Sequence, residues 1–259
     1  MSGTCEPKVL LFVDNSNIFI AAKTEAYHRE GRAAKDQVRL EFGKMVELAL
    51  VGRPLAKAFV VGSIPPEERE VWNRLEDATG VKPELYERGG ISGEEQGLDQ
   101  CLQVHMLRAI SDYADDPQIA VLMTGDGAGY DDGVGFHADM ERMRAAGWGI
   151  EVISWKRSCR RVLSDWATTN GTLVCLDDYY ESVTFLKGGG RRAAALDFSA
   201  RQVSTPRPSP IRLAQLKAKE ESDARIRELE AKVNLLEAKR AVKAAGKSKY
   251  DKRMRRRKK

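Results

Sequence analysis

The sequence lacks long apolar runs, and it has few cysteines and few histidines. Its apolar stretches, such as residues 9–13, are far shorter than the roughly 20 residues of a membrane helix, so we expect no membrane association. The four cysteines include no CxxC pair, and the three histidines show no HxxxH spacing. We therefore expect neither a disulfide framework nor a cysteine-ligated zinc site. The first residues also lack the basic segment and apolar stretch of a secretory signal, which favours a cytoplasmic protein.

Charge is divided unevenly along the 259 residues. The formal net charge is +5, but residues 188–259 hold 22 Lys and Arg against 8 Asp and Glu, a net charge of +14. Residues 1–187 therefore carry a net charge of −9. An acidic first part with a basic end predicts two different roles along one chain. A basic end of this kind favours nucleic acid, with an affinity that depends strongly on salt.

Short apolar runs alternate with helical patterns throughout residues 1–187. The runs are typical of strands that are covered on both faces, and they fall at residues 8–14, 57–63, 81–86, 119–124, 149–155 and 172–176. The helical patterns lie at residues 18–29, 36–51, 66–79, 97–114, 136–146 and 158–167. This alternation predicts a three-layer α/β domain over residues 1–187 with a mostly parallel central sheet.

The composition changes beyond residue 187. Residues 188–210 are rich in glycine and proline and predict a linker, and residues 211–246 predict a helix. Within that helix, Ile226, Leu229, Val233 and Leu236 repeat at the 3-4-3 spacing of a short coiled coil. A homodimer through residues 211–245 and a lone solvated helix are both compatible with this pattern.

The last residues form a dense basic cluster. Residues 247–259 predict a disordered tail, since they hold almost no apolar side chains. The cluster at residues 252–259 is compatible with an RNA-binding arm, with a solubilising end and, if the host is eukaryotic, with a nuclear-import signal.

Three acidic motifs stand where an open α/β sheet collects its ligands. Asp14 ends the first predicted strand, Asp126 follows the strand at residues 119–124, and Asp99 opens the helix at residues 97–114. Each has a purely structural alternative, because a carboxylate also favours a helix start. Together, however, clustered carboxylates repel one another unless a cation lies between them. Hard oxygen ligands of this kind predict Mg²⁺ or Mn²⁺.

The same motifs carry a family resemblance. The stretches VLLFVDNSN at 9–17, QGLD at 96–99, TGDG at 124–127 and GFHADMERMRAAGWGIEVISW at 135–155 resemble the NYN domain family of PIN-like ribonucleases. LDDYYESVTF at 176–185 is similar to a subset of that family. The resemblance spans about residues 8–186. It implies a metal-dependent endoribonuclease fold in which Asp14, Asp99 and Asp126 match the metal-binding acids and Asn17 matches the asparagine of the opening motif.

The sequence departs from the family pattern in three places. Many members have KGVD where residues 96–99 read QGLD, and many have an acid where His105 stands. Many have GDSDF where residues 125–129 read GDGAG, so a second aspartate is missing. Asp131 or Asp132 could take its place from the longer loop.

These observations lead to one main hypothesis and two alternatives. In the main hypothesis, Asp14, Asp99 and Asp126 are catalytic, and with Asp131 or Asp132 they bind a divalent ion that activates a water to attack single-stranded RNA. The expected substrate-binding residues, which include a tyrosine on which a base could stack, are Asn15, Asn17, Thr124, Gly127 and Tyr130. The first alternative is a catalytically degenerate RNA-binding or adaptor protein of the same fold. The second is a phosphate-compound site in the loop at residues 125–135.

Overall fold

Six strands form one parallel sheet in the part of the chain that the structure, a computed structural model, describes (residues 6–64, 69–87, 98–125, 133–188, 190–207, 213–215, 217–235 and 237). The strand order is β4-β3-β1-β5-β6-β7, and all neighbouring pairs are parallel. The bounds are β1 (Val9–Asp14), β3 (Leu55–Ile64), β4 (Glu84–Glu87), β5 (Ile119–Met123), β6 (Gly149–Ser154) and β7 (Thr172–Cys175). The predicted parallel α/β sheet is confirmed.

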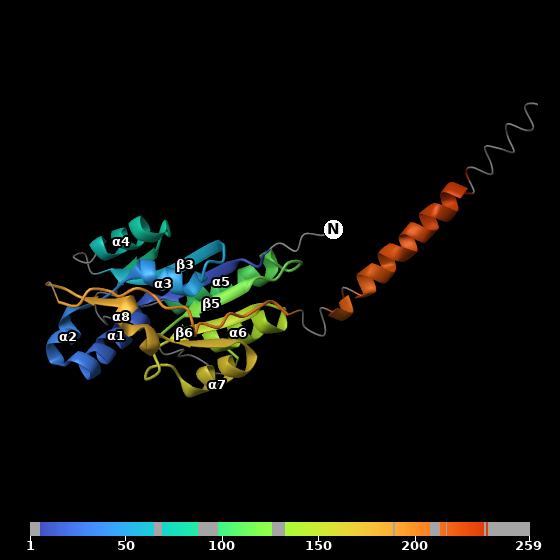
Figure 1. Ribbon diagram of the computed structural model, residues 1–259. Coiled ribbons are helices and arrows are strands. Elements are labelled where there is room, and N and C mark those ends of the chain that lie inside the picture. The colour runs from blue at the N-terminus through green and yellow to red at the C-terminus, as the bar shows by residue number, and fades with distance from the viewer. Residues whose placement is uncertain are drawn as a thin grey trace, which may run out of the picture. The chain divides into compact units, whose positions relative to one another are not determined.

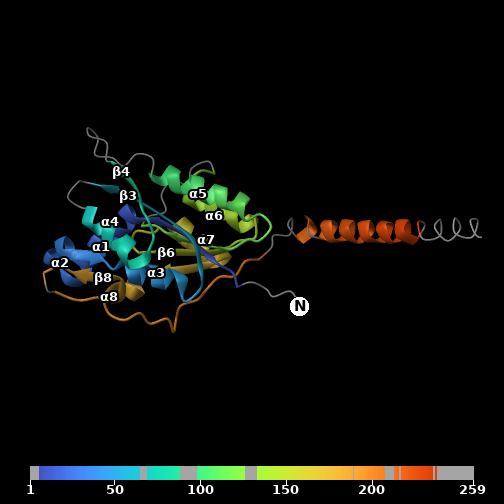
Figure 2. The same ribbon diagram turned by 90° about the horizontal axis from the view of Figure 1, so that it is seen from above.

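Helices cover both faces of this sheet, as Figures 1 and 2 show. The first face is covered by α1 (Asn15–Glu30), α3 (Phe42–Leu50) and α4 (Arg69–Thr79), together with the short helices α2 (Arg32–Gln37) and α8 (Tyr180–Val183). The second face is covered by α5 (Leu98–Asp112), α6 (Phe136–Ala145) and α7 (Arg161–Asn170). A 3₁₀ turn, η2 (Leu176–Tyr179), precedes α8.

Two apolar cores follow from the alternation of side chains along the central strand. Leu11 and Val13 of β1 pack under the first layer of helices, and Leu10 and Phe12 pack under the second. All four are at most 5% exposed. Because β1 is buried on both faces, its end at Asp14 is held at a fixed place on the carboxyl edge of the sheet.

A second, two-stranded sheet interrupts the region predicted as one helix over residues 36–51. There α2 ends at Gln37, β2 (Val38–Leu40) follows, and α3 starts at Phe42. β2 pairs antiparallel with β8 (Thr184–Leu186). The prediction of one continuous helix was wrong because Val38 and Leu40 alternate with Arg39 and bury their side chains in the core, which suits a strand.

The chain divides into two compact units, Met1–Ser209 and Pro210–Lys259. In the first unit, residues 190–207 contain no helix or strand, yet they lie against the sheet. Arg201 forms an ion pair with Glu151 of β6, and the backbone N–H of Ser204 donates to the same carboxylate at 2.8 Å. The segment predicted as a linker is therefore anchored to the head over part of its length.

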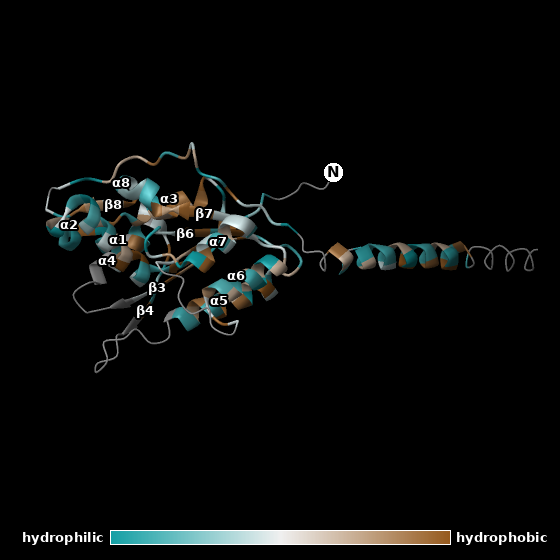
Figure 3. Ribbon diagram, turned by 90° about the horizontal axis from the view of Figure 1, so that it is seen from below, coloured by the Kyte–Doolittle hydropathy of each residue, from teal (hydrophilic) through white to brown (hydrophobic). Residues whose placement is uncertain are grey.

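The second unit contains a helix within residues 213–235. Its residues are mostly hydrophilic with interspersed apolar ones (Figure 3), and Ile226, Leu229 and Val233 are each about half exposed. Leu236 of the predicted seam and the tail at residues 247–259 lie outside the described residues. The coiled-coil dimer stays a prediction. Among the described residues, no helix combines the length and apolar character needed to cross a membrane.

Candidate functional site

Asp14 lies at the carboxyl end of β1 and begins α1. Its side chain is buried, at 2% exposure, and caps the helix by accepting from the backbone N–H of Asn17 at 3.3 Å. The amide Nδ2 of Asn17 donates to Asp14 Oδ2 at 2.6 Å. Asp14 therefore does cap a helix, and Asn17 holds its carboxylate by two hydrogen bonds. A fixed carboxylate at a strand end suits ligand binding as well.

Thr124 joins the TGDG stretch at 124–127 to Asp14. It follows β5, whose Met123 pairs with Val13 of β1, and its side chain is fully buried. The Thr124 hydroxyl donates to Asp14 Oδ2 at 3.2 Å. Parallel pairing thus brings two motifs that are 110 residues apart into direct contact.

Gly125 makes this contact possible. A Cβ atom at this position would lie 2.2 Å from the carbonyl oxygen of Asn17 and 2.8 Å from its Cβ, which no side chain can tolerate. Two hydroxyls also fix this turn: Ser154 donates to the carbonyl oxygen of Thr124 at 2.6 Å, and Ser158 donates to that of Gly125. The glycine therefore serves close backbone packing beside Asp14.

A pocket of about 200 Å³ opens beside this turn. The side chain of Arg157 is 64% exposed, and its Nε atom lies 3.7 Å from Glu25 Oε2. Trp155 is buried, and its indole N–H donates to the carbonyl oxygen of Ile18 in α1 at 3.0 Å. The polar and charged part of the lining comes from Asn17, Thr24, Glu25, Arg157 and Ser158. The pocket thus offers both signs of charge next to the carboxyl edge of the sheet.

Of the remaining predicted residues, the structure describes Asp99 and Asn15, and the others lie outside the described part of the chain. Asp99 stands in the first turn of α5, a helix that packs against β1 and β3. Asn15 is 7% exposed, and the structure shows no hydrogen-bond donor to its Oδ1 among the described residues. The residues that lie outside the described part of the chain are Asp126, Gly127, Tyr130, Asp131 and Asp132.

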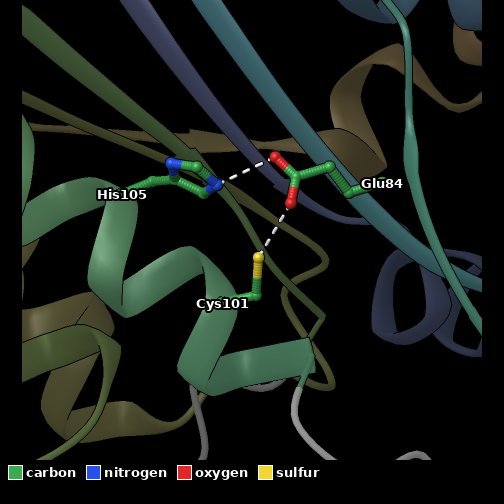
Figure 4. A group of neighbouring side chains, drawn as sticks. All are labelled: Glu84, Cys101 and His105. Carbon is green, nitrogen blue, oxygen red and sulfur yellow. Dashed lines mark hydrogen bonds and ion pairs between the residues drawn. The ribbon is translucent and has the colours of Figure 1, made fainter.

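Another cluster of ligand-type side chains lies between β4 and α5 (Figure 4). The Nε2 atom of His105 is 2.8 Å from Glu84 Oε1, and the thiol of Cys101 donates to Glu84 Oε2 at 3.1 Å. One ligand atom from each residue lies within 4.8 Å of the other two. Sequence reasoning missed this group, because paired cysteines are the usual sign of such a site. The available signal was the spacing of Cys101 and His105, one turn apart on a helix face.

The sheet register places this cluster near Asp14. Asp14 pairs with Val61 of β3, and Val61 pairs with Glu84 of β4. Neighbouring strands are about 4.8 Å apart, so the Cα atoms of Asp14 and Glu84 are separated by roughly 10 Å. The two groups of candidate ligands therefore occupy neighbouring positions along one edge of the sheet.

His137, in the first turn of α6, lies in the interior. It is 3% exposed and its ring lies 5.1 Å from that of Trp166. Burial lowers the pKa of His137, and the nearby Glu141 only partly opposes this effect. A buried imidazole packed against an indole serves packing rather than anion binding.

The fold is compatible with a PIN-like domain, since a mostly parallel sheet carries a buried aspartate at its carboxyl edge. Fold alone does not establish an activity, because one architecture supports many functions. In comparisons with known proteins, the chain matches no family model, no curated protein and no solved structure.

Proposed function

We propose that this chain is a metal-dependent endoribonuclease of the NYN family, in which Asp14, Asp99 and Asp126 hold Mg²⁺ or Mn²⁺. The observation that carries the proposal is the buried Asp14 carboxylate, held by Asn17 and Thr124 at the carboxyl edge of a parallel sheet. Its oxygen atoms are the hard donors that these ions prefer, so the donor set fits the metal. A divalent ion bound there would polarise a phosphodiester and make a water more acidic.

The residues around Asp14 have their own tasks in this proposal. Asn17 and Thr124 orient the carboxylate, since both donate hydrogen bonds to Asp14 Oδ2. In this proposal Asp99 would contribute its carboxylate from the first turn of α5, a helix that packs against β1. Arg157, which lines the adjoining pocket beside Glu25, would supply the positive charge that binds an RNA phosphate.

The test is cleavage of single-stranded RNA with Mg²⁺ or Mn²⁺. Asp14→Asn and Asp99→Asn should each lower the rate on the order of 10²–10³-fold, as the loss of a charge-stabilising group does elsewhere. Asp112→Asn is the matched control, because Asp112 lies at the other end of α5 and is 58% exposed. This control should cleave at the wild-type rate, and thermal unfolding should show that all three variants fold.

The outcomes separate the enzyme from its main alternative. RNA binding without cleavage by the wild-type protein, with both metals, would identify an RNA-binding adaptor of the same fold. Cleavage that survives in Asp14→Asn would remove Asp14 from the metal site and contradict the proposal.

A further inference from the structure

We infer that Glu84, Cys101 and His105 form a zinc site, distinct from the aspartate site proposed above. Among the described residues, these three bring a carboxylate, a thiol and an imidazole to within 4.8 Å of one another. Figure 4 shows all three side chains pointing toward a common point between β4 and α5. The inference rests on this donor set and its geometry.

The types of donor favour zinc over the harder ions. Cysteine sulfur and histidine nitrogen are zinc ligands, and Asp or Glu oxygen is compatible with both, whereas Mg²⁺ takes oxygen ligands. Three protein ligands leave a fourth tetrahedral position for water or another small ligand. The Glu84 side chain is 42% exposed and that of His105 is 19% exposed, so an ion can reach the site from solvent.

The distances suit a tetrahedral ion. Zinc bonds of 2.0–2.3 Å place neighbouring ligand atoms about 3.3–3.8 Å apart. The separations of 2.8 Å between Glu84 and His105 and 3.1 Å between Glu84 and Cys101 are slightly shorter. Side-chain rotations that move the donors by less than about 1 Å therefore open the group to the size of the ion.

The surrounding structure holds the ligands in place before any ion binds. Cys101 and His105 are one turn apart on α5, so the helix itself fixes their separation. The His105 ring stacks on Phe59 of β3 with 4.2 Å between centroids, and Phe59 stacks on Phe12 of the fully buried strand β1. Such preorganisation lowers the entropic cost of binding.

Zinc binding would connect an edge strand to a helix. Among the described strands, β4 has one neighbour, β3, and Glu84 is the first residue of β4. As the ion binds, two protons pass to solvent: that of the Cys101 S–H bond, and the one that lies between His105 Nε2 and Glu84 Oε1. The thiolate, the bare imidazole nitrogen and the carboxylate oxygen then bond to zinc. The ion thereby replaces the direct contacts of Glu84 with Cys101 and His105 by coordinate bonds to β4 and α5, which should stabilise the folded state.

The experiment uses the full chain, stripped of metal with a chelator and titrated with Zn²⁺ in a calorimeter. We expect one zinc per chain at this site and a thermal midpoint that rises with the zinc concentration. Because even an outer-shell change typically costs 10–100-fold in affinity, each of Glu84→Gln, Cys101→Ser and His105→Ala should cost about 100-fold or more. The Co²⁺-loaded wild type should show a thiolate-to-cobalt absorption band that Cys101→Ser lacks.

Two controls make the result specific. A chain with Cys159 and Cys175 both changed to Ser should keep wild-type zinc affinity, because neither of these described thiols belongs to the cluster. Asp14→Asn should also keep it, and excess Mg²⁺ should not compete, so this inference and the ribonuclease proposal can fail separately. The zinc site is overturned if the wild type binds no Zn²⁺, or if any of the three ligand variants binds it with wild-type affinity.

Discussion

At the scale of single residues, Gly125 determines how closely the turn after β5 approaches Asn17 in the first turn of α1. Its backbone packs so near Asn17 that a methyl group would lie 2.2 Å from a carbonyl oxygen. A backbone atom cannot move aside as the end of a flexible side chain can. The positions of Asp14 and Thr124 therefore depend on residue 125 having no Cβ atom.

Gly125→Ala should lower the free energy of unfolding by about 1–3 kcal/mol, the usual cost of overpacking a tight site. Gly43→Ala is the matched control. Gly43 lies within α3, and a Cβ atom there would be 3.6 Å from Glu41 Oε1, an ordinary contact. The control should be neutral or stabilising by about 0.5–1 kcal/mol, since alanine favours a helix. Urea unfolding of both variants measures the difference, and equal stability of the two would contradict the role given to Gly125.

At the scale of elements, the sequence predicted those strands whose apolar pattern is long enough to recognise. β1, β5 and β6 are buried on both faces, so their residues are apolar almost without interruption and indicate a parallel sheet. β2 and β8 have three residues each, too few for a clear alternation, and their pairing joins segments more than 140 residues apart. Sequence periodicity carries no information about such a contact.

In the candidate site, too, the sequence predicted local features but not contacts between distant segments. Asp14 was predictable because it ends a strong strand pattern, and the edge of a parallel sheet is where ligands bind. The contact of Thr124 with Asp14 follows from the strand order, which periodicity alone does not reveal. The spacing of Cys101 and His105 on α5 was visible in the sequence, but their third partner, Glu84, was not predictable because only the fold brings β4 beside α5.

A buried ion pair anchors residues 201–204 to β6. Glu151 is fully buried and accepts from Arg53 at 2.6 Å and from Arg201, and these two side chains are at most 9% exposed. Burial alone would raise the pKa of Glu151, but the hydrogen bonds and charges of Arg53 and Arg201 outweigh it and hold the pKa below its usual value. The carboxylate therefore contributes stability above its unfolded pKa of about 4.5, and this contribution disappears as the pH falls through the lower folded value.

Glu151→Gln should destabilise the protein by about 3–5 kcal/mol at neutral pH, because two arginines lose their buried counter-charge. The difference between wild type and variant should shrink in acid as the wild-type carboxyl protonates. Asp165→Asn is the control, since its ion pair with Arg161 is highly exposed and worth at most about 1 kcal/mol. Thermal unfolding from neutral to acidic pH provides the measurement. A stability difference between wild type and Glu151→Gln that grows in acid would contradict this role of the carboxylate.

At the scale of the whole molecule, the charge asymmetry coincides with the division into two units. Residues 210–259 hold 18 basic and 7 acidic residues, a net charge of +11, and the first unit carries the acidic remainder. The boundary follows the anchored segment at residues 201–204. A truncation at residue 209 therefore removes the basic unit and keeps the ion pair of Glu151 intact.

The truncated chain, residues 1–209, should bind single-stranded RNA more weakly than the full chain, with a flatter dependence on salt. For every phosphate that the basic unit neutralises in the full chain, the slope of log K against log salt concentration should become shallower by about 0.7 on truncation. Fluorescence anisotropy of labelled RNA at several salt concentrations gives both slopes. The full chain with Gln in place of the seven basic residues at 252–259 serves as a length-matched control. Equal slopes for the full and truncated chains would exclude the basic unit from RNA binding.

Trp155 gives the molecule a built-in optical reporter. Its indole lines the pocket beside Gly125 and is hydrogen-bonded to the first turns of α1, the helix that Asp14 caps. Its emission should therefore respond when a ligand fills the pocket or shifts α1, whereas Trp148 lies fully buried in the other core. Binding at this edge of the sheet can thus be followed without a label, and Trp155→Phe would identify the part of the signal that comes from the site.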